Sequence, residues 1–216
     1  MHYRLIPNSF HFENLSLFNT SYRGLHMKNN TYENDVRILG GKFKGKLLPV
    51  LDVEGLRPTP SRVRETIFSW IKDSLGNAKV LDLFAGSGAL GLEAYSRGAK
   101  DVTLVELDKD NSSNLKEIAK SMSYDEIHVI NDDALHFLDN VSSSFNIVFI
   151  DPPYKLDIYE KVLEKLLDKN LIDDDSLIYV EMRNGSNKIV PGYEIIREEN
   201  AGQSKYSLWT KSKLLF

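Results

Sequence analysis

The chain has 216 residues, of which 42% are hydrophobic and 27% charged, and its formal net charge is −4. This length and composition are typical of a soluble globular protein with one full core, and no apolar run approaches the length of a membrane span. The chain contains no cysteine, which excludes disulfides, thiolate zinc sites and any mechanism that uses a cysteine nucleophile.

Residues 1–35 carry no clear pattern and no continuous apolar segment, which argues against a secretory signal. We expect this leader to be poorly ordered. A weak organellar transit peptide with Arg4, Arg23 and Lys28 stays open, as does a true translation start at Met27. We therefore divide the chain into a leader (1–35), an N-terminal extension (36–60) and a main domain (61–216).

The extension and the start of the main domain are basic. The pattern predicts a small hairpin over 36–49, then a rigid segment in which Thr59 caps a helix whose first residue is Pro60. Asp52 and Glu54 are the acidic residues between Val36 and Arg64, whereas the basic ones are Arg37, Lys42, Lys44, Lys46, Arg57, Arg62 and Arg64. Such polarity predicts a surface that binds RNA phosphates. The alternatives are a solvated lysine-rich hairpin and arginines held in structural ion pairs.

From residue 79 onward the apolar pattern alternates between strand and helix. The predicted strands are Lys79–Phe84, Asp101–Glu106, Glu126–Ile130, Phe145–Ile150 and Ser176–Met182. The predicted helices are Ala89–Arg97, Lys109–Met122, Ala134–Leu138 and Ile158–Leu167. Five such units predict a parallel, doubly wound α/β sheet with right-handed crossovers. Two last strands, Tyr193–Arg197 and Tyr206–Thr210, have no helix between them and predict an antiparallel hairpin at one edge.

The first of these strands leads into a glycine-rich loop. Its Gly-x-Gly-x-x-Gly spacing is a weak signal that NAD and flavin proteins share. Glu106 is placed to bind a ribose diol, which also fits NAD. Asp82 could hold a methionyl ammonium, and Asp132 with Asp133 falls where an adenine is expected, so we favour S-adenosylmethionine. The expected cofactor-binding residues are Asp82, Phe84, Gly86, Gly88, Glu106, Leu107, Asp133, Ala134 and Asp151.

The most informative motif is Asp151-Pro152-Pro153-Tyr154, directly after a buried strand. The prolines force the chain out of the sheet at the carboxyl end of the strand, where ligands bind in open α/β sheets. A carboxylate, a turn carbonyl and an aromatic ring together suit a flat base with an exocyclic amine. Asp151, Pro152 and Tyr154 are therefore the candidate catalytic residues. A turn with a helix-capping Asp is the alternative.

Several motifs together resemble the bacterial 16S ribosomal RNA guanine-N2 methyltransferases over residues 36–210. They are RPTPSRVRE at Arg57–Glu65, DLFAGSGALG at Asp82–Gly91, DPPY at Asp151–Tyr154, RILGG at Arg37–Gly41 and AGQxxY at Ala201–Tyr206. The arginine-rich block is the specific part, whereas the glycine loop is generic. One departure is visible, because Ser61 stands where the family commonly has Asp.

The resemblance implies a Rossmann-like class I methyltransferase: a seven-stranded, mostly parallel sheet with an antiparallel C-terminal hairpin and a small N-terminal β-hairpin that helps engage RNA. The implied cofactor is S-adenosylmethionine, and the implied substrate is one guanine of 16S rRNA within an assembling 30S particle. We expect a cytoplasmic monomer without a metal or a membrane partner. Which nucleotide is modified, and whether naked RNA or a particle is preferred, stays open.

In the expected mechanism, Asp151 and the Pro152 carbonyl accept the two hydrogens of the guanine amine, while Tyr154 stacks on the base. Either Asp151 or water takes the final proton. Three rivals remain: an N6-adenine DNA methyltransferase, a non-catalytic RNA-binding assembly factor and an NAD-dependent oxidoreductase. We interpret His128 and His136 as structural, and Trp70 and Trp209 as core residues.

Overall fold

The computed structural model describes residues 35–51, 59–123, 125–153, 155–186 and 189–213, all within one unit, Thr31–Phe216. The predictions for the leader before residue 35, for Arg57 and for Tyr154 lie outside these described residues. Within the described ranges, none of the helices combines the length and hydropathy that a bilayer crossing requires.

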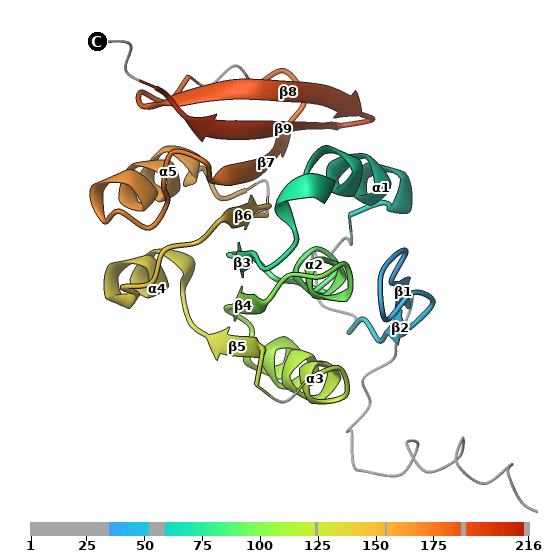
Figure 1. The fold of residues 1–216 in the computed structure, drawn as a ribbon. Helices are drawn as coiled ribbons and strands as arrows, with labels where there is room; N and C mark the ends of the chain where they lie inside the picture. Colours follow the sequence, from blue (N-terminus) through green and yellow to red (C-terminus); the bar gives the residue numbers. More distant parts are fainter. Residues whose placement is uncertain (1–34, 52–58, 124, 154, 187–188, 214–216) are drawn as a thin grey trace, which may run out of the picture. The chain divides into compact units, whose positions relative to one another are not determined.

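A seven-stranded sheet of order β5-β4-β3-β6-β7-β9-β8 forms the centre of the fold (Figure 1). Its strands are β3 (Lys79–Asp82), β4 (Asp101–Glu106), β5 (Ile127–Asn131), β6 (Ile147–Ile150), β7 (Leu177–Arg183), β8 (Tyr193–Ala201) and β9 (Ser204–Lys211). Strands β3 to β7 pair in parallel, and β9 is antiparallel to both β7 and β8. The predicted doubly wound sheet and its antiparallel C-terminal hairpin are confirmed.

Helices cover both faces of this sheet. One face carries α1 (Ser61–Trp70), α2 (Gly91–Ser96) and α3 (Lys109–Lys120), and the other carries α4 (Ala134–Asn140) and α5 (Tyr159–Asp168) (Figure 1). Successive strand residues serve opposite faces. Val80 and Phe149 therefore join the core under the first helix set, whereas Leu81 and Val148 join the core under the second. A short 3-10 turn, η1 (Lys72–Ser74), follows α1.

The N-terminal hairpin is present but has short strands. β1 (Val36–Arg37) pairs antiparallel with β2 (Leu47–Leu48). Its connecting loop packs against the end of α2, where the backbone N–H groups of Lys42 and Phe43 donate to the carbonyl and the hydroxyl of Ser96 at 2.7 and 2.9 Å. Contacts with α2 therefore help to hold this hairpin to the sheet domain.

Two of the differences from the predicted boundaries have a clear physical reason. Helix α1 begins at Ser61 with Pro60 as its N-cap, and no side chain caps it, so Thr59 does not serve as the predicted cap. The pairing of β8 with β9 continues as far as Ala201 and Ser204. Gly202, with a φ of +60°, allows a two-residue turn there, so both strands are longer than the sequence pattern indicates.

The predicted core tryptophans lie at different depths. Trp209 is buried, with only 3% of its surface exposed. Trp70 is partly buried at the margin of the core and stacks on Tyr206 with ring centroids 5.5 Å apart.

Candidate active site

Acidic side chains gather where the parallel strands end. Asp82 closes β3 and Glu106 closes β4, while Asp133 and Asp151 follow β5 and β6. The carboxyl ends of parallel strands meet at one edge of a sheet, and this edge is where α/β enzymes bind ligands. The structure therefore brings together the acidic residues that the sequence assigned to the cofactor and to catalysis.

The glycine loop between β3 and α2 is held from two sides. Gly86 N–H donates to Glu106 Oε2 at 2.9 Å, and Asn111 Nδ2 donates to the Gly86 carbonyl at 2.6 Å. Gly88 has a φ of +74°, and a Cβ there would lie 2.7 Å from the side chain of Leu92. Only glycine fits this position, so the loop offers bare backbone beside partly buried Phe84.

Glu106 connects that loop to the end of β4. Burial raises the pKa of Glu106, and the N–H groups of Asp108 and Gly86 act in the opposite direction. Its Oε1 accepts from Asp108 N–H at 2.8 Å. A carboxylate has about four acceptor positions, so the side chain can still accept from a diol.

Asp82 lies inside the protein with 2% of its surface exposed. Its Oδ2 accepts from the Gly91 N–H at 2.9 Å, at the start of α2. Burial, together with the nearby charge of Glu106, raises the pKa of Asp82 to about 7, and the N–H groups of Gly91 and Phe84 oppose the shift. The Asp82 carboxyl therefore ionises near neutral pH, and its negative charge could then bind a nearby cation.

The ends of β4 and β5 form the predicted adenine region. Leu107 is 67% exposed, and Asp133 caps α4 by accepting from the N–H groups of Leu135 and His136 at 2.9 and 3.1 Å. Ala134 is buried at the first position of α4. Asn131, which the sequence reasoning missed, donates to the carbonyls of Glu106 and Leu107 at 2.9 Å. The side chain of Leu107 is exposed and apolar, and the neighbouring backbone groups are already hydrogen-bonded. Such a surface suits a flat ring.

The two histidines outside this core have carboxylate partners. His136 Nδ1 lies 2.8 Å from Asp132, and this hydrogen bond raises the pKa of His136. His128 Nε2 lies 3.2 Å from Asp101 Oδ2. Both side chains are hydrogen-bonded, as the sequence reasoning expected, but they lie at the surface rather than in the core.

Asp151 is partly exposed at the end of β6, and Pro152 behind it is buried. Thr59 Oγ1 donates to Asp151 Oδ2 at 3.4 Å. Burial raises the pKa of Asp151 well above its usual range, the charges of Glu181 and Asp82 raise it further, and the Thr59 hydroxyl opposes the shift. The carboxyl therefore faces other acids and one hydroxyl donor rather than a lysine.

Glu181 is a second acid beside Asp151 that the sequence reasoning missed. Ile150 pairs with Val180 in the parallel ladder, which places the next residues, Asp151 and Glu181, side by side. Glu181 is 6% exposed, and the Tyr179 hydroxyl donates to its Oε2 at 2.7 Å. A strand buried on both faces is normally continuous in apolar residues, so one acid within β7 was the available signal.

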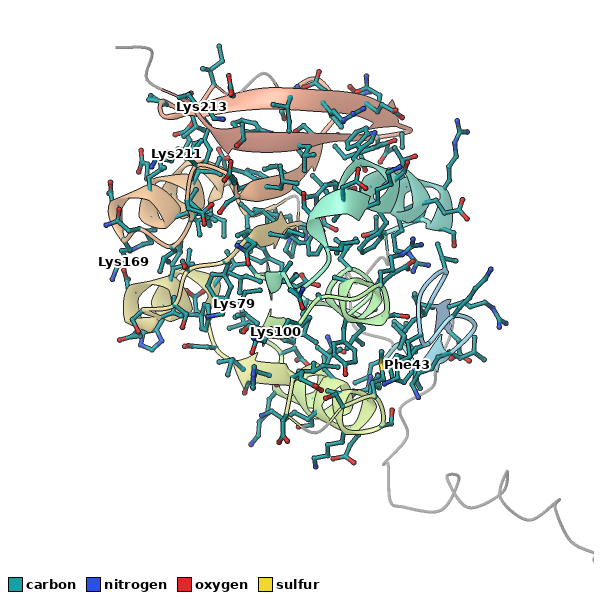
Figure 2. The ribbon with its side chains drawn as sticks, in the orientation of Figure 1. Phe43, Lys79, Lys100, Lys169, Lys211 and Lys213 are labelled. Atoms are coloured by element: carbon teal, nitrogen blue, oxygen red, sulfur yellow. The ribbon has the colours of Figure 1, made fainter. Side chains whose placement is uncertain are left out.

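The hairpin lysines lie away from Asp151. Figure 2 labels Phe43 at the hairpin. Phe43 stacks on Tyr95 of α2 with ring centroids 5.9 Å apart, and Lys42 Nζ lies 5.3 Å from the Phe43 ring. After α2, Gly98 accepts from Asn77 N–H just before β3, so this end of α2 lies at the amino edge of the sheet. Lys42 and Lys44 are exposed there, roughly 15–20 Å, one strand length, from the carboxyl edge.

Arg64 is not a surface residue. Its side chain is 2% exposed and its Nη1 lies 2.7 Å from Glu93 Oε2, whose residue is fully buried. This placement corrects the predicted RNA contact, because a guanidinium inside the protein cannot reach a phosphate. Arg62 and Ser61 are exposed at the start of α1. The contact of Arg62 with RNA phosphates therefore stays a prediction.

The chain was compared with known proteins and structures. A family model described as "Conserved hypothetical protein 95" matches residues 36–210. The ribosomal RNA small subunit methyltransferase D of Escherichia coli is 40% identical over 185 residues, which cover 85% of this chain and 93% of the relative. The protein of the same name from Haemophilus influenzae is 39% identical over 182 residues, covering 82% and 94%.

A solved structure from Escherichia coli, described provisionally as a methyltransferase, superposes with a TM-score of 0.75. It is 40% identical, and the match covers 82% of this chain and 98% of that one. Family model, relatives and fold therefore agree with the motifs. The chain belongs to the family described as Conserved hypothetical protein 95, that of the bacterial 16S ribosomal RNA guanine-N2 methyltransferases.

Proposed function

We propose that this protein transfers a methyl group from S-adenosylmethionine to the exocyclic N2 amine of a guanine in 16S ribosomal RNA. The observation that carries the proposal is the position of Asp151. Asp151 is partly exposed at the carboxyl edge of the sheet, next to buried Pro152 and near Asp82 at the end of β3. The names of the relatives support a small-subunit RNA as the substrate.

The residues at this edge fit the methyl donor. Glu106 would accept from the ribose diol, Asp82 would face the methionyl ammonium, and exposed Leu107 would contact adenine beside Asp133 and Ala134. Gly86 and Gly88, with Phe84, would allow close approach of the donor to the backbone. When bound, S-adenosylmethionine supplies an electrophilic methyl carbon on a positively charged sulfur. The cluster of carboxylates would favour such a cation over a pyrophosphate.

Asp151 and the Pro152 carbonyl would act on the guanine amine. The lone pair of this nitrogen is delocalised into the ring, so the amine is a weak nucleophile. Two fixed acceptors for its hydrogens would allow the nitrogen to become pyramidal and would stabilise the positive charge that develops there. The raised pKa of Asp151 favours this carboxylate over water as the group that takes the proton. Tyr154 would stack on the base.

The RNA backbone would contact the basic residues outside the acidic edge. Lys42, Lys44 and Lys46 of the hairpin, with Arg62 at the start of α1, are the candidates. We take an assembling 30S particle as the physiological form of the substrate and a cytoplasmic monomer as the form of the protein.

The test is methyl transfer to 16S rRNA and to 30S particles by purified Asp151→Ala protein. We expect turnover to fall by about 10³-fold or more because the amine loses its acceptor. The affinity for S-adenosylmethionine, measured by calorimetry, should change little. Asp139→Ala, which removes an exposed carboxylate of α4, is the matched control and should keep full turnover.

Mass mapping of nucleosides identifies the product. One 2-methylguanosine in 16S rRNA is the expected result. Substantial turnover by Asp151→Ala would refute the role of Asp151. Formation of 6-methyladenine in DNA would instead favour the rival enzyme.

A further inference from the structure

Arg64 joins three segments that are far apart in the sequence. Its Nη1 donates to the carbonyl of Arg37 in β1 at 3.0 Å and to Glu93 Oε2 in α2 at 2.7 Å. Its Nε donates to the carbonyl of Thr59 at 3.2 Å. Because the guanidinium is planar and rigid, these bonds fix the hairpin, the segment before α1 and α2 against one another.

Thr59 carries this network to the catalytic edge. It is 7% exposed, its carbonyl accepts from Arg64, and its hydroxyl donates to Asp151 Oδ2 at 3.4 Å. The hydroxyl does not cap α1, whose N-cap is Pro60. The Thr59 hydroxyl therefore donates to Asp151 instead of capping the helix.

Glu93 holds the other end of the guanidinium. It is fully buried, and its Oε1 accepts from Nε and Nη2 of Arg97 at 2.9 and 2.7 Å. Glu93 lies on α2, whose first residue, Gly91, donates to Asp82. Replacing a buried ion pair by apolar residues is often neutral or stabilising, so stability alone does not require this arrangement.

The surroundings of Asp151 explain why such a constraint is useful. Glu181 lies beside it and Asp82 is near, and the negative charges of both disfavour its ionised form. The Thr59 hydroxyl is a neutral donor that favours the carboxylate and selects one orientation. Because Arg64 fixes the backbone of Thr59, the Thr59 hydroxyl selects that orientation of the Asp151 carboxylate more strongly.

We propose that Arg64 is a positioning residue for Asp151, acting through Thr59 and held in place by Glu93. This inference rests on the proposed function, in which Asp151 accepts a hydrogen of the target amine. Arg64 touches neither the base nor the methyl donor in this scheme. Its effect is to fix the carbonyl, and so the hydroxyl, of Thr59.

Thr59→Val and Arg64→Lys test the proposal by their effect on kcat. Each should lower kcat about tenfold, as expected when a hydrogen bond to a charged group is removed, with little change in the KM for S-adenosylmethionine. Lysine can still pair with Glu93 but cannot reproduce the forked bonds to the two carbonyls. Thr59→Ser keeps the hydroxyl and should restore most of the turnover.

The pH profile gives a second readout that a purely structural residue would not move. The Thr59 hydroxyl lowers the pKa of Asp151, so its removal should shift the acidic limb of kcat to higher pH. Arg64→Lys should shift the limb in the same direction, and Thr59→Ser should leave it in place. An unmoved limb in Thr59→Val would overturn the proposal.

Arg97→Lys is the matched control for Arg64→Lys. Arg97 binds the same Glu93 carboxylate but is not among the partners of Thr59. It should lower the melting temperature without moving the pH profile. If Arg64→Lys and Arg97→Lys have the same effect on stability and neither changes kcat, Arg64 is only structural and the inference is wrong.

A double-mutant cycle separates the route from the proposed function. If Arg64 acts through Thr59, the Thr59→Val/Arg64→Lys double variant should have the kcat of Thr59→Val alone. Multiplied effects would show independent action and contradict the inference. If the double variant does not fold, the comparison of Thr59→Val with Thr59→Ser in kcat and pH profile tests the proposal by itself. Absence of methyl transfer to 16S rRNA by the natural protein would refute the proposed function itself. Full turnover by Asp151→Ala would refute the role of Asp151, whereas inactive Asp151→Ala with unaffected Thr59→Val would refute only the positioning role.

Discussion

Among single residues, Asp82 shows how burial sets the charge of a side chain. The unfolded chain has a carboxyl with an ordinary pKa of 3.8, whereas in the folded protein the pKa of Asp82 is about 7. The folded state therefore binds this proton more tightly. A pKa raised on folding contributes stability below about pH 4 and loses that contribution as the pH rises through about 7.

Asp82→Asn should remove the destabilisation that the buried negative charge of Asp82 causes at high pH. An amide of the same shape can still accept from the Gly91 N–H but carries no charge. We expect the free energy of unfolding at pH 8 to exceed that of the natural protein by about 1–3 kcal/mol, with little difference at pH 4. Urea unfolding at both pH values measures the change.

A control and a functional readout accompany that substitution. Asp139→Asn removes an exposed carboxyl whose pKa is lowered by its hydrogen bond with Lys165, so it should not stabilise at pH 8. Affinity for S-adenosylmethionine should fall in Asp82→Asn, since the ammonium would lose its counter-charge. A variant less stable than the natural protein at pH 8 would contradict the explanation.

The sequence predicts some site residues because their type and spacing are local signals. Asp151 follows a buried strand within a four-residue motif, and Glu106 follows the glycine loop at a fixed distance. The partners of Arg64 and Glu181 were beyond such reasoning, because they lie elsewhere in the chain. Glu93 lies 29 residues after Arg64, and the neighbour of Glu181 across the ladder is known only from the register.

Among the elements, the N-terminal hairpin makes a very close backbone contact with α2. Gly41 has a φ of +78°, and a Cβ there would lie 1.8 Å from the Ser96 carbonyl oxygen of α2. Gly45 also has a positive φ, +90°, but a Cβ there would meet nothing within 4 Å. Both glycines therefore have a backbone conformation that would strain another residue, and they differ in the contact that a Cβ would make.

Gly41→Ala and Gly45→Ala form a matched pair. Both should cost about 1–2 kcal/mol of stability for a side chain in the left-handed region. Gly41→Ala should in addition displace the hairpin from α2 and weaken 16S rRNA binding several-fold, measured by filter binding. Equal RNA affinity of the two variants would show that docking of the hairpin does not matter for the RNA.

The boundaries of the five parallel strands were predictable to within two residues, because each strand carries a local run of apolar residues. Strand β4 has the predicted limits, and β5 and β7 differ from theirs by one residue at each end. The second half of β8 is exposed and polar, so the sequence pattern predicted this strand only as far as Arg197 and not to Ala201. Pairing with β9 defines it, and a partner strand is not visible in a local pattern.

Across the whole molecule, charge is separated between the two edges of the sheet. Carboxylates gather at the carboxyl edge, whereas Lys42 and Lys44 lie by the far end of α2. The fold class and the acidic edge followed from the sequence. The position of the lysines did not, because it depends on how the hairpin packs against Ser96. An RNA that reaches Asp151 and these lysines must extend along the side of the domain.

Replacing Lys42, Lys44 and Lys46 by Gln should weaken 16S rRNA binding and lower its salt dependence. Removal of one phosphate-binding lysine should reduce the slope of log K against log salt by about 0.7–0.9. Lys161, Lys165 and Lys169 on α5 and its C-cap, at the other face of the sheet, give a control with the same change in charge. If both triple variants have the natural slope, the hairpin does not bind phosphates.

The order of strands also affects how the newly made chain matures. Strand β9 lies between β7 and β8 although it is the last of these strands in the sequence. In the ladder its Tyr206 pairs with Glu181 and its Leu208 with Tyr179. Domains fold as units, so the scaffold around Asp151 stays unfinished until residues as far as Lys211 have left the ribosome. A nascent chain that already carries every candidate catalytic motif would therefore still lack the finished scaffold around Asp151.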